Sequence, residues 1–180
     1  MLISAREAAK ELAGVGVPRR HARRLIACGA AGPATRTAGS LLLDDRRVAE
    51  LAARPHLTED DLAATCPWGV FIARREVRAF GTGEEAWREL GRDWRFSPWT
   101  MVWLRSRIDR HGFVPLVATV SGFVLGGAEI TGVSQVRAEL FGLTLRSPGA
   151  WFDGVRDTRV DTPPGRPWVV LGWDMKARVG

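Results

Sequence analysis

Hydrophobic residues in the first third of the chain recur at spacings of three and four, which is the pattern of short amphipathic helices. The first helix is expected to start after Ser4, because Ser4 and Glu7 have the spacing of a capping box. Small alanines and Leu12 then form its inner stripe, and Gly14 marks its end. A turn over residues 13–17 separates this helix from the next.

The second helix is expected over residues 18–27 and has two contrasting faces. Pro18 suits a helix start because its φ is already fixed. Ala22, Leu25 and Ile26 fall within an arc of about 100° and form the packing face. Basic side chains spread over an opposing arc of about 140°. They are Arg19, Arg20, Arg23 and Arg24. The pattern favours a helix that binds a negatively charged partner; a solvated surface helix is the alternative.

A β-hairpin is expected after the arginine-rich helix. Residues 35–37 suit a first strand, residues 41–43 suit the returning strand, and a glycine-containing turn lies between them. Arg36 lies on the first strand, where it could reach a phosphate backbone or a minor groove. A third helix follows, capped by Asp44 or Asp45.

This order of elements resembles the winged helix-turn-helix of MerR-type regulators and phage excisionases. The matching residues are Glu7-Ala8-Ala9, Val17 through Ile26, Gly29, Pro33-Ala34, Arg36, Gly39 and Leu43. The resemblance covers residues 2–54. One departure is the separation of thirteen positions between Leu12 and Leu25, which is longer than the compact turn usual in that family.

The resemblance implies a mode of DNA binding. Helix 18–27 would enter the major groove, and the hairpin of residues 33–43 would act as a wing on the flanking backbone. The candidate DNA contacts are Arg19, Arg20, His21, Arg23, Arg24 and Arg36.

Charge and tryptophan divide the chain into two parts. Residues 1–56 hold ten Arg and Lys against five Asp and Glu, a net charge of +5, whereas residues 57–180 hold sixteen against fifteen, a net charge of +1. All eight tryptophans lie at or after Trp68. This break predicts a DNA-binding domain over residues 1–56, a connector over residues 57–67 and a second domain over residues 68–180.

The second domain is expected to be an α+β domain with helices on one side of a mainly antiparallel sheet. Strands are expected over residues 69–80, 114–120, 123–130, 136–145 and 168–173, and helices over residues 82–90 and from Ser97 onward. The predicted fold class of the whole chain is therefore α+β, with an N-terminal winged helix-turn-helix followed by a tryptophan-rich α+β domain.

Tryptophan interleaved with arginine is the unusual feature of the second domain. Trp94, Trp99 and Trp103 alternate with arginines, a mixture that could stack bases or enclose a ligand. Filling the core of a small domain is the alternative interpretation, and it is favoured because each tryptophan buries a large apolar area.

No catalytic set, cofactor site or metal site is expected. Glu129 stands alone in an apolar strand and is either a buried acid or, more in keeping with its residue type, solvent-facing or salt-bridged. Residues 109–111 could supply a base, but a basic helix C-terminus is the favoured interpretation. Residues 126–127 lack the strand-to-helix setting of a phosphate loop. Cys28 and Cys66 are expected to be buried thiols in a reducing compartment.

These patterns leave three functional hypotheses. The first is a sequence-specific regulator that binds double-stranded DNA as a homodimer, with a small-molecule or protein effector at the second domain. The alternatives are a DNA-processing or nucleotide-acting enzyme and an excisionase-like factor that bends DNA. The N-terminus has no hydrophobic signal core, and no apolar run reaches about 18 residues, so a cytoplasmic protein without a membrane span is expected.

Overall fold

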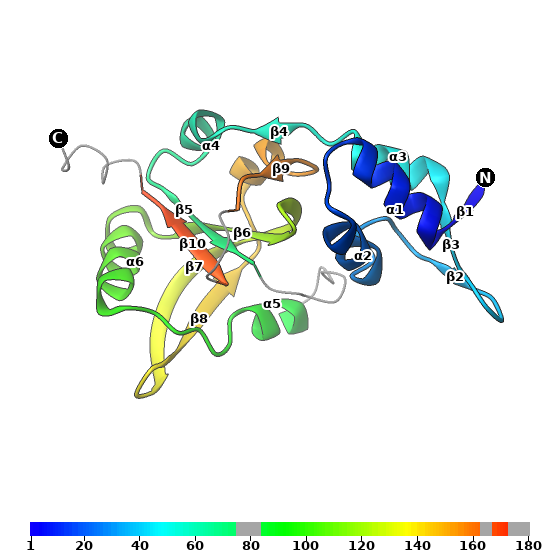
Figure 1. The fold of residues 1–180 in the computed structure, drawn as a ribbon. Coiled ribbons are helices and arrows are strands. Elements are labelled where there is room, and N and C mark those ends of the chain that lie inside the picture. The colour runs from blue at the N-terminus through cyan, green and yellow to red at the C-terminus, as the bar shows by residue number, and fades with distance from the viewer. Residues whose placement is uncertain (75–83, 163–166, 173–180) are drawn as a thin grey trace.

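The computed structural model describes residues 1–74, 84–162 and 167–172. Three helices and a small sheet form an N-terminal unit, which lies beside a larger unit built on an extended sheet (Figure 1). Most neighbouring strands in the larger sheet are antiparallel. The predicted α+β class with a mainly antiparallel sheet is therefore confirmed.

The N-terminal unit places three helices against a three-stranded antiparallel sheet. The helices are α1 (Ala5–Gly14), α2 (Arg19–Ala27) and α3 (Asp45–Ala52), and the strands are β1 (Leu2–Ser4), β2 (Thr35–Arg36) and β3 (Leu41–Asp44), in the order β1-β3-β2. The expected capping box is present: the Glu7 amide donates to Ser4 Oγ at 3.3 Å, and the Ser4 amide donates to the Glu7 carboxylate at 2.8 Å. The sequence prediction lacks β1, because three residues are too few to show an alternating pattern.

One face of each N-terminal helix is buried in a common core. Its members include Ala8, Leu12, Ala22, Leu25, Ile26, Leu43, Val48 and Leu51. The alanines on α1 allow α2 to approach closely, since they add little bulk between the two backbones. The predicted inner stripes are therefore confirmed.

The second unit is organised around a seven-stranded sheet. Its strands are β4 (His56–Leu57), β5 (Val70–Ala73), β6 (Val114–Val120), β7 (Phe123–Arg137), β8 (Leu140–Arg146), β9 (Arg159–Val160) and β10 (Trp168–Leu171), in the order β10-β5-β6-β7-β9-β4, with β8 paired to β7. The pairs β5–β6 and β4–β9 are parallel. The strongly apolar β6 is buried along its whole length, as expected for a central strand.

Helices cover both faces of this sheet. The helices are α4 (Glu59–Thr65), α5 (Glu84–Leu90), α6 (Pro98–His111) and the 3₁₀ helix η1 (Ala150–Gly154). Along β5, Phe71 and Ala73 face the core under α5 and α6, whereas Val70 and Ile72 face the core under α4 and η1. The expectation of helices on one side of the sheet is therefore wrong, because α4 and η1 supply a second layer.

Two further segments differ from the sequence prediction. Residues 57–67 do not form a connector: β4 joins the large sheet, and Leu62 and Cys66 are buried in its core. The strand expected over residues 136–145 is wrong, because a hairpin turn after Arg137 divides this stretch between β7 and β8. Part of the strand expected over residues 69–80 and the start of the helix expected over residues 82–90 lie outside the described residues.

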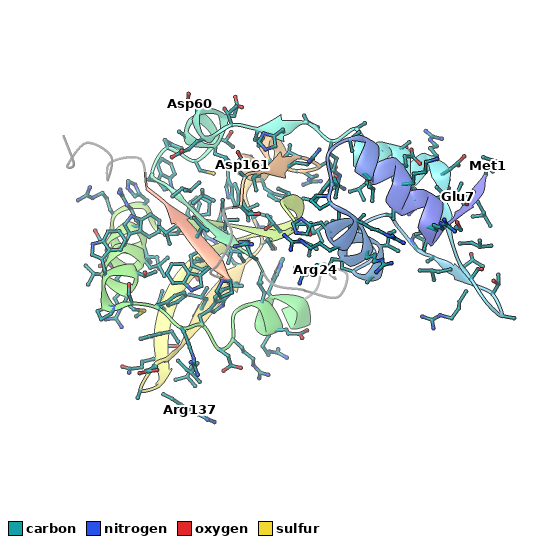
Figure 2. All side chains as sticks on the ribbon, viewed as in Figure 1. Met1, Glu7, Arg24, Asp60, Arg137 and Asp161 are labelled. Carbon is teal, nitrogen blue, oxygen red and sulfur yellow. The ribbon has the colours of Figure 1, made fainter. Side chains whose placement is uncertain are left out.

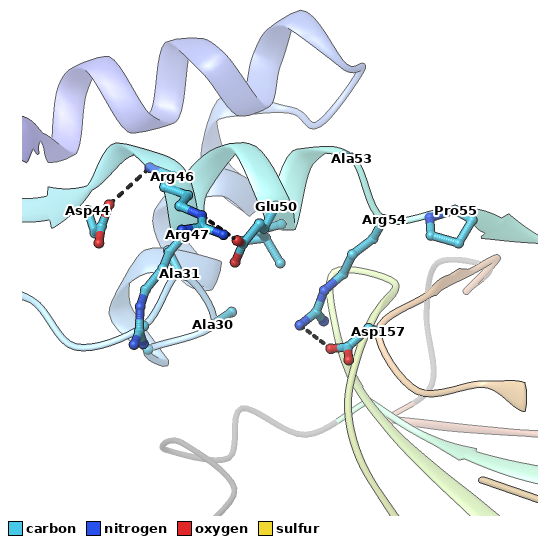
Figure 3. A pocket seen from close by; sticks show the side chains of 13 residues that line it. Ala30, Ala31, Asp44, Arg46, Arg47, Glu50, Ala53, Arg54, Pro55 and Asp157 are labelled. Atoms are coloured by element: carbon cyan, nitrogen blue, oxygen red, sulfur yellow. Dashed lines mark hydrogen bonds and ion pairs between the residues drawn. The ribbon is translucent and has the colours of Figure 1, made fainter. Parts of the chain in front are cut away.

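The two units share packing and polar contacts. Val120 and Phe123, from the turn between β6 and β7, belong to the same buried cluster as the N-terminal helices. Arg54, just after α3, donates to the Val124 carbonyl oxygen at 2.8 Å and pairs with Asp157 at 2.7 Å (Figure 3). The N-terminal unit is thus held at the end of the large sheet where β6 turns into β7.

Candidate nucleic-acid interface

The start and end of α2 follow from its flanking residues. Pro18 is the N-cap rather than the first helical residue, with φ −57° and ψ 143°, and its carbonyl oxygen accepts from the His21 amide at 2.7 Å. At the other end, Cys28 is the C-cap and Gly29 has φ +79°, a left-handed conformation that glycine adopts without a steric cost. The helix is therefore short and fixed at both ends.

The two faces of α2 separate as the sequence predicts. Ala22, Leu25 and Ile26 are buried in the N-terminal core. The exposed side chains are those of Arg19, Arg20, Arg23 and Arg24, and His21 is half-buried. A helix held by its apolar face thus presents four guanidinium groups outside the core.

A groove of about 1020 Å³ lies between α1 and α2 and extends to β3. Four cationic side chains line it, Arg6 and Lys10 from α1 and Arg19 and Arg23 from α2. In the described part of the chain, none of these four has a carboxylate within ion-pair distance. Glu7 also lines the groove, but its carboxylate accepts from Ser4 Oγ at 2.7 Å. With four positive and one negative side chain, the groove carries a net charge of +3.

Arg6 and Lys10 are not among the DNA contacts that the sequence predicts. Their four-residue separation on a helix places them on one face, so the periodicity that identified the arginines of α2 could also have identified them. What it could not show is that this face of α1 lies along the same groove as Arg19 and Arg23, because that depends on how α1 packs on α2.

The opposite edge of α2 faces the second unit. Partial burial lowers the pKa of His21, and the positive charges of Arg20, Arg24 and Arg74 lower it further. Arg74 directly follows β5 of the large sheet, and α2 is in contact with β6 of the same sheet, so the second unit approaches α2. Arg24 lies on the side of α2 toward the large sheet (Figure 2). The groove edge and the His21 edge of α2 thus have different surroundings.

The hairpin formed by β2 and β3 carries Arg36 at an exposed position. Its turn is closed by the Thr37 amide and hydroxyl, which donate to the Ser40 carbonyl oxygen at 2.9 Å and 3.1 Å. The hairpin extends away from the helices of the N-terminal unit (Figure 1). Arg36 is therefore placed on a protruding element at one end of the unit.

The three singled-out tryptophans do not share one environment. Trp94 and Trp103 are buried in the core under α5 and α6, and the Trp94 indole N–H donates to the Leu90 carbonyl oxygen at 2.8 Å. Trp99 is 53% exposed on α6. The core interpretation therefore applies to Trp94 and Trp103, and Trp99 is the one of the three that is open to a partner.

Glu129 is both buried and salt-bridged. Its carboxylate accepts from Arg146 Nε at 2.6 Å, from the Gly149 amide at 3.0 Å and from the Trp151 indole N–H at 3.0 Å. A carboxylate with three donors is fixed in place, which suits a structural role better than that of a mobile base.

The other residues considered for catalysis, His111 and the two cysteines, also have structural surroundings. His111 stacks on Trp68, with ring centres 4.8 Å apart, at the end of α6, and Gly112 caps that helix with φ +83°. Both cysteines are buried, and burial raises the pKa of Cys66 to about 12, which makes it a poor nucleophile.

The described residues contain no group of three or more His, Cys, Asp or Glu side chains that could hold a metal ion. Nor does any helix in the described ranges have the length and apolar character needed to cross a membrane.

No protein-family model, curated protein or solved structure matches the chain. The resemblance to MerR-type regulators and excisionases therefore stays an expectation based on residues 2–54.

Proposed function

We propose that this chain binds double-stranded DNA in a sequence-specific manner through its N-terminal unit and acts as a transcriptional regulator. The observation that carries the proposal is the groove between α1 and α2. Four cationic side chains line it, and the carboxylate of Glu7, its one acidic side chain, accepts a hydrogen bond from Ser4 Oγ. Phosphate backbones bind such surfaces by releasing counterions, and arginine adds bidentate hydrogen bonds.

The proposed docking follows the helix-turn-helix arrangement. α2 would enter the major groove with its exposed arginines, while Arg6 and Lys10 on α1 would contact the backbone beside it. The β2–β3 hairpin would act as the wing and bring Arg36 to the flanking phosphates. Three features support this docking: the buried apolar face of α2, its exposed basic face and the protruding hairpin on the same unit.

We also propose that the regulator acts as a homodimer. A single helix of nine residues reaches only a few base pairs, whereas paired half-sites about 34–36 Å apart give a longer and more specific target. The protein–DNA stoichiometry tests this part, and a monomer on its specific site would contradict it.

The experiment that tests DNA binding is a charge-matched comparison. One variant replaces the four groove cations, Arg6, Lys10, Arg19 and Arg23, with Gln. The control replaces four exposed arginines of the second unit, Arg92, Arg105, Arg110 and Arg137, with Gln. Both variants lose four positive charges, so a general charge effect would be equal in the two.

A genomic DNA selection on the parent protein first provides a specific duplex, and a scrambled duplex of the same length serves as reference. We expect the groove variant to lose affinity for the specific duplex by at least about 10³-fold at moderate salt, and the control variant to retain it. Equal binding by the parent and the groove variant would overturn the proposal. Bending of the selected duplex, measured by fluorescence energy transfer between its ends, distinguishes an architectural factor from a regulator that leaves DNA straight.

A further inference from the structure

A second cavity lies where the two units meet. Its volume is about 480 Å³, within the range of sites for small organic ligands. The end of α2 and the loop after it contribute residues 28–30, α5 contributes Trp87 and Leu90, and η1 contributes Phe152. The cavity is thus bounded by both units and by the end of the helix that carries the arginines.

Gly126 and Gly127 of strand β7 also line this cavity. A Cβ at Gly127 would collide with the ring of Phe152, so the glycine allows this ring to pack directly on the strand. Gly126 and Gly127 do not form a phosphate loop. They line a cavity whose wall also contains aromatic side chains.

One cationic side chain of the cavity, that of Arg156, forms only a weak, solvent-exposed ion pair. Arg156 lines the cavity, and the guanidinium carbon lies 5.4 Å from the centre of the Phe152 ring. Its ion pair with Asp153 spans 3.0 Å, but the two side chains are 59% and 72% exposed, and a pair so well solvated contributes little. A ligand anion can therefore replace Asp153 at small cost.

Arg54 also lines the cavity, but its guanidinium already has protein partners. Its side chain is only 18% exposed and donates both to the Val124 carbonyl oxygen and to Asp157. Asp157 lines the cavity as well, but its carboxylate is paired with Arg54 at 2.7 Å. The cationic group available to an incoming ligand is thus Arg156, which lies beside the aromatic surface of Phe152 and Trp87.

We propose that this cavity binds a small aromatic molecule carrying one carboxylate, with the ring against Trp87 and Phe152 and the carboxylate on Arg156. Aromatic walls favour a planar apolar body. A guanidinium favours a planar anion that it can hold with two hydrogen bonds. The site does not depend on whether the N-terminal unit binds DNA.

The test is calorimetric titration of the full chain with 2-naphthoate and with 2-naphthamide, which has the same ring system but no charge. We expect 2-naphthoate to bind the parent protein at one site, about 10- to 100-fold more tightly than the amide, because it alone forms a charge-assisted bond to Arg156. Arg156→Gln should weaken 2-naphthoate by a similar factor and leave the amide unchanged. Trp87→Ala should weaken both ligands.

Matched controls are Arg110→Gln and Trp99→Ala, which remove an exposed arginine and an exposed tryptophan of α6, outside this cavity. They should bind both ligands as the parent does, and circular dichroism confirms that each variant is folded. Three outcomes would overturn the proposal: no binding of 2-naphthoate to the parent, equal affinity for acid and amide, or loss of binding in the controls to the same extent as in Arg156→Gln.

Discussion

Arg54 donates a hydrogen bond to the carbonyl oxygen of Val124 at 2.8 Å, and this contact joins the end of α3 to β7 across the boundary between the two units. The same guanidinium pairs with Asp157 at 2.7 Å. Because Val120 and Phe123 are buried against the N-terminal helices, the polar contact lies beside a shared apolar core. The units are therefore expected to unfold together rather than one at a time.

Arg54→Met tests this coupling. It leaves the Val124 carbonyl oxygen without this donor, and we expect a loss of about 1–3 kcal/mol in the free energy of unfolding. The tryptophans within the described residues all lie in the second unit, so their fluorescence follows that unit, whereas far-ultraviolet circular dichroism follows the helices of both. In urea the two signals should coincide for the parent protein, and Arg54→Met should move the dichroism midpoint below the fluorescence midpoint.

Arg47→Met is the matched control, since Arg47 is an exposed arginine on α3 near Arg54. It should change the free energy of unfolding by less than about 0.5 kcal/mol. Separate transitions in the parent protein would show that the N-terminal unit folds independently, as the charge break in the sequence suggested.

Glu129 supports a second stability prediction. Glu129→Ala removes the acceptor of the Gly149 amide and of the Trp151 indole N–H, and leaves Arg146 without its carboxylate. We expect a loss of about 2–4 kcal/mol in the free energy of unfolding, since unsatisfied donors cost about 1–3 kcal/mol each and Arg146 is itself largely solvated. Urea unfolding followed by tryptophan fluorescence measures the change.

Glu139→Ala provides the control for this prediction, because Glu139 is exposed in the turn between β7 and β8. Its effect should stay within about 0.5 kcal/mol. A similarly small effect for Glu129→Ala would mean that the carboxylate and its three donors contribute little to stability.

Local signals in the sequence identified most helix starts. The capping box at Ser4 and the Ser97-Pro98 pair each act within one turn of their own helix, so no tertiary information is needed to recognise them. The buried face of α6 is harder to recognise, since its apolar residue Val102 is 67% exposed. The apolar residues of α6 surround much of the helix, so its periodicity does not define which face is buried.

Contacts between segments that are distant in the sequence could not be predicted from the local pattern of residues. β4 and β9 have two residues each and exist only because His56–Leu57 pairs with Arg159–Val160. The donors to Glu129 lie 17 to 22 positions further along the chain, so nothing beside Glu129 in the sequence indicates them. The groove is a similar case, because its two rows of cations come from separate helices.

The exposed arginines of α2 are expected to differ in role. Sequence reasoning places Arg20 and Arg24 farthest from the packing face, and the structure places Arg23 in the groove beside α1. Arg20→Ala should therefore cost about 1–3 kcal/mol on the specific duplex and relax the preference at one base pair. Arg23→Ala should weaken specific and scrambled duplexes alike and reduce the log–log salt slope by about 0.9.

Binding of each variant to both duplexes across a salt series measures this difference, with thermal melts as the check on folding. Arg36→Ala on the hairpin should behave like Arg23→Ala if, as we propose, the hairpin contacts phosphates. If Arg20→Ala and Arg23→Ala changed base preference to the same extent, the assignment of the groove edge to the backbone would be wrong.

His21 links the stability of the protein to pH. Partial burial and the charges of Arg20, Arg24 and Arg74 lower its pKa in the folded state below the ordinary histidine value of about 6.5. Between these two pKa values the unfolded chain binds more protons at this site than the folded chain. The contribution of His21 to the free energy of unfolding is therefore constant above about pH 6.5 and decreases as the pH falls from there to the folded pKa.

The prediction is that His21→Gln removes part of the stability loss that the parent protein shows on acidification below pH 6.5. Urea unfolding at a series of pH values measures it, and a proton NMR titration of the His21 ring reports the folded pKa directly. Arg74→Gln serves as the second test, because removing this positive charge should raise the pKa of His21 toward its ordinary value. If the His21 ring titrates at or above pH 6.5 in the folded protein, or if Arg74→Gln leaves its pKa unchanged, the second unit does not approach this edge of α2 as closely as the structure indicates.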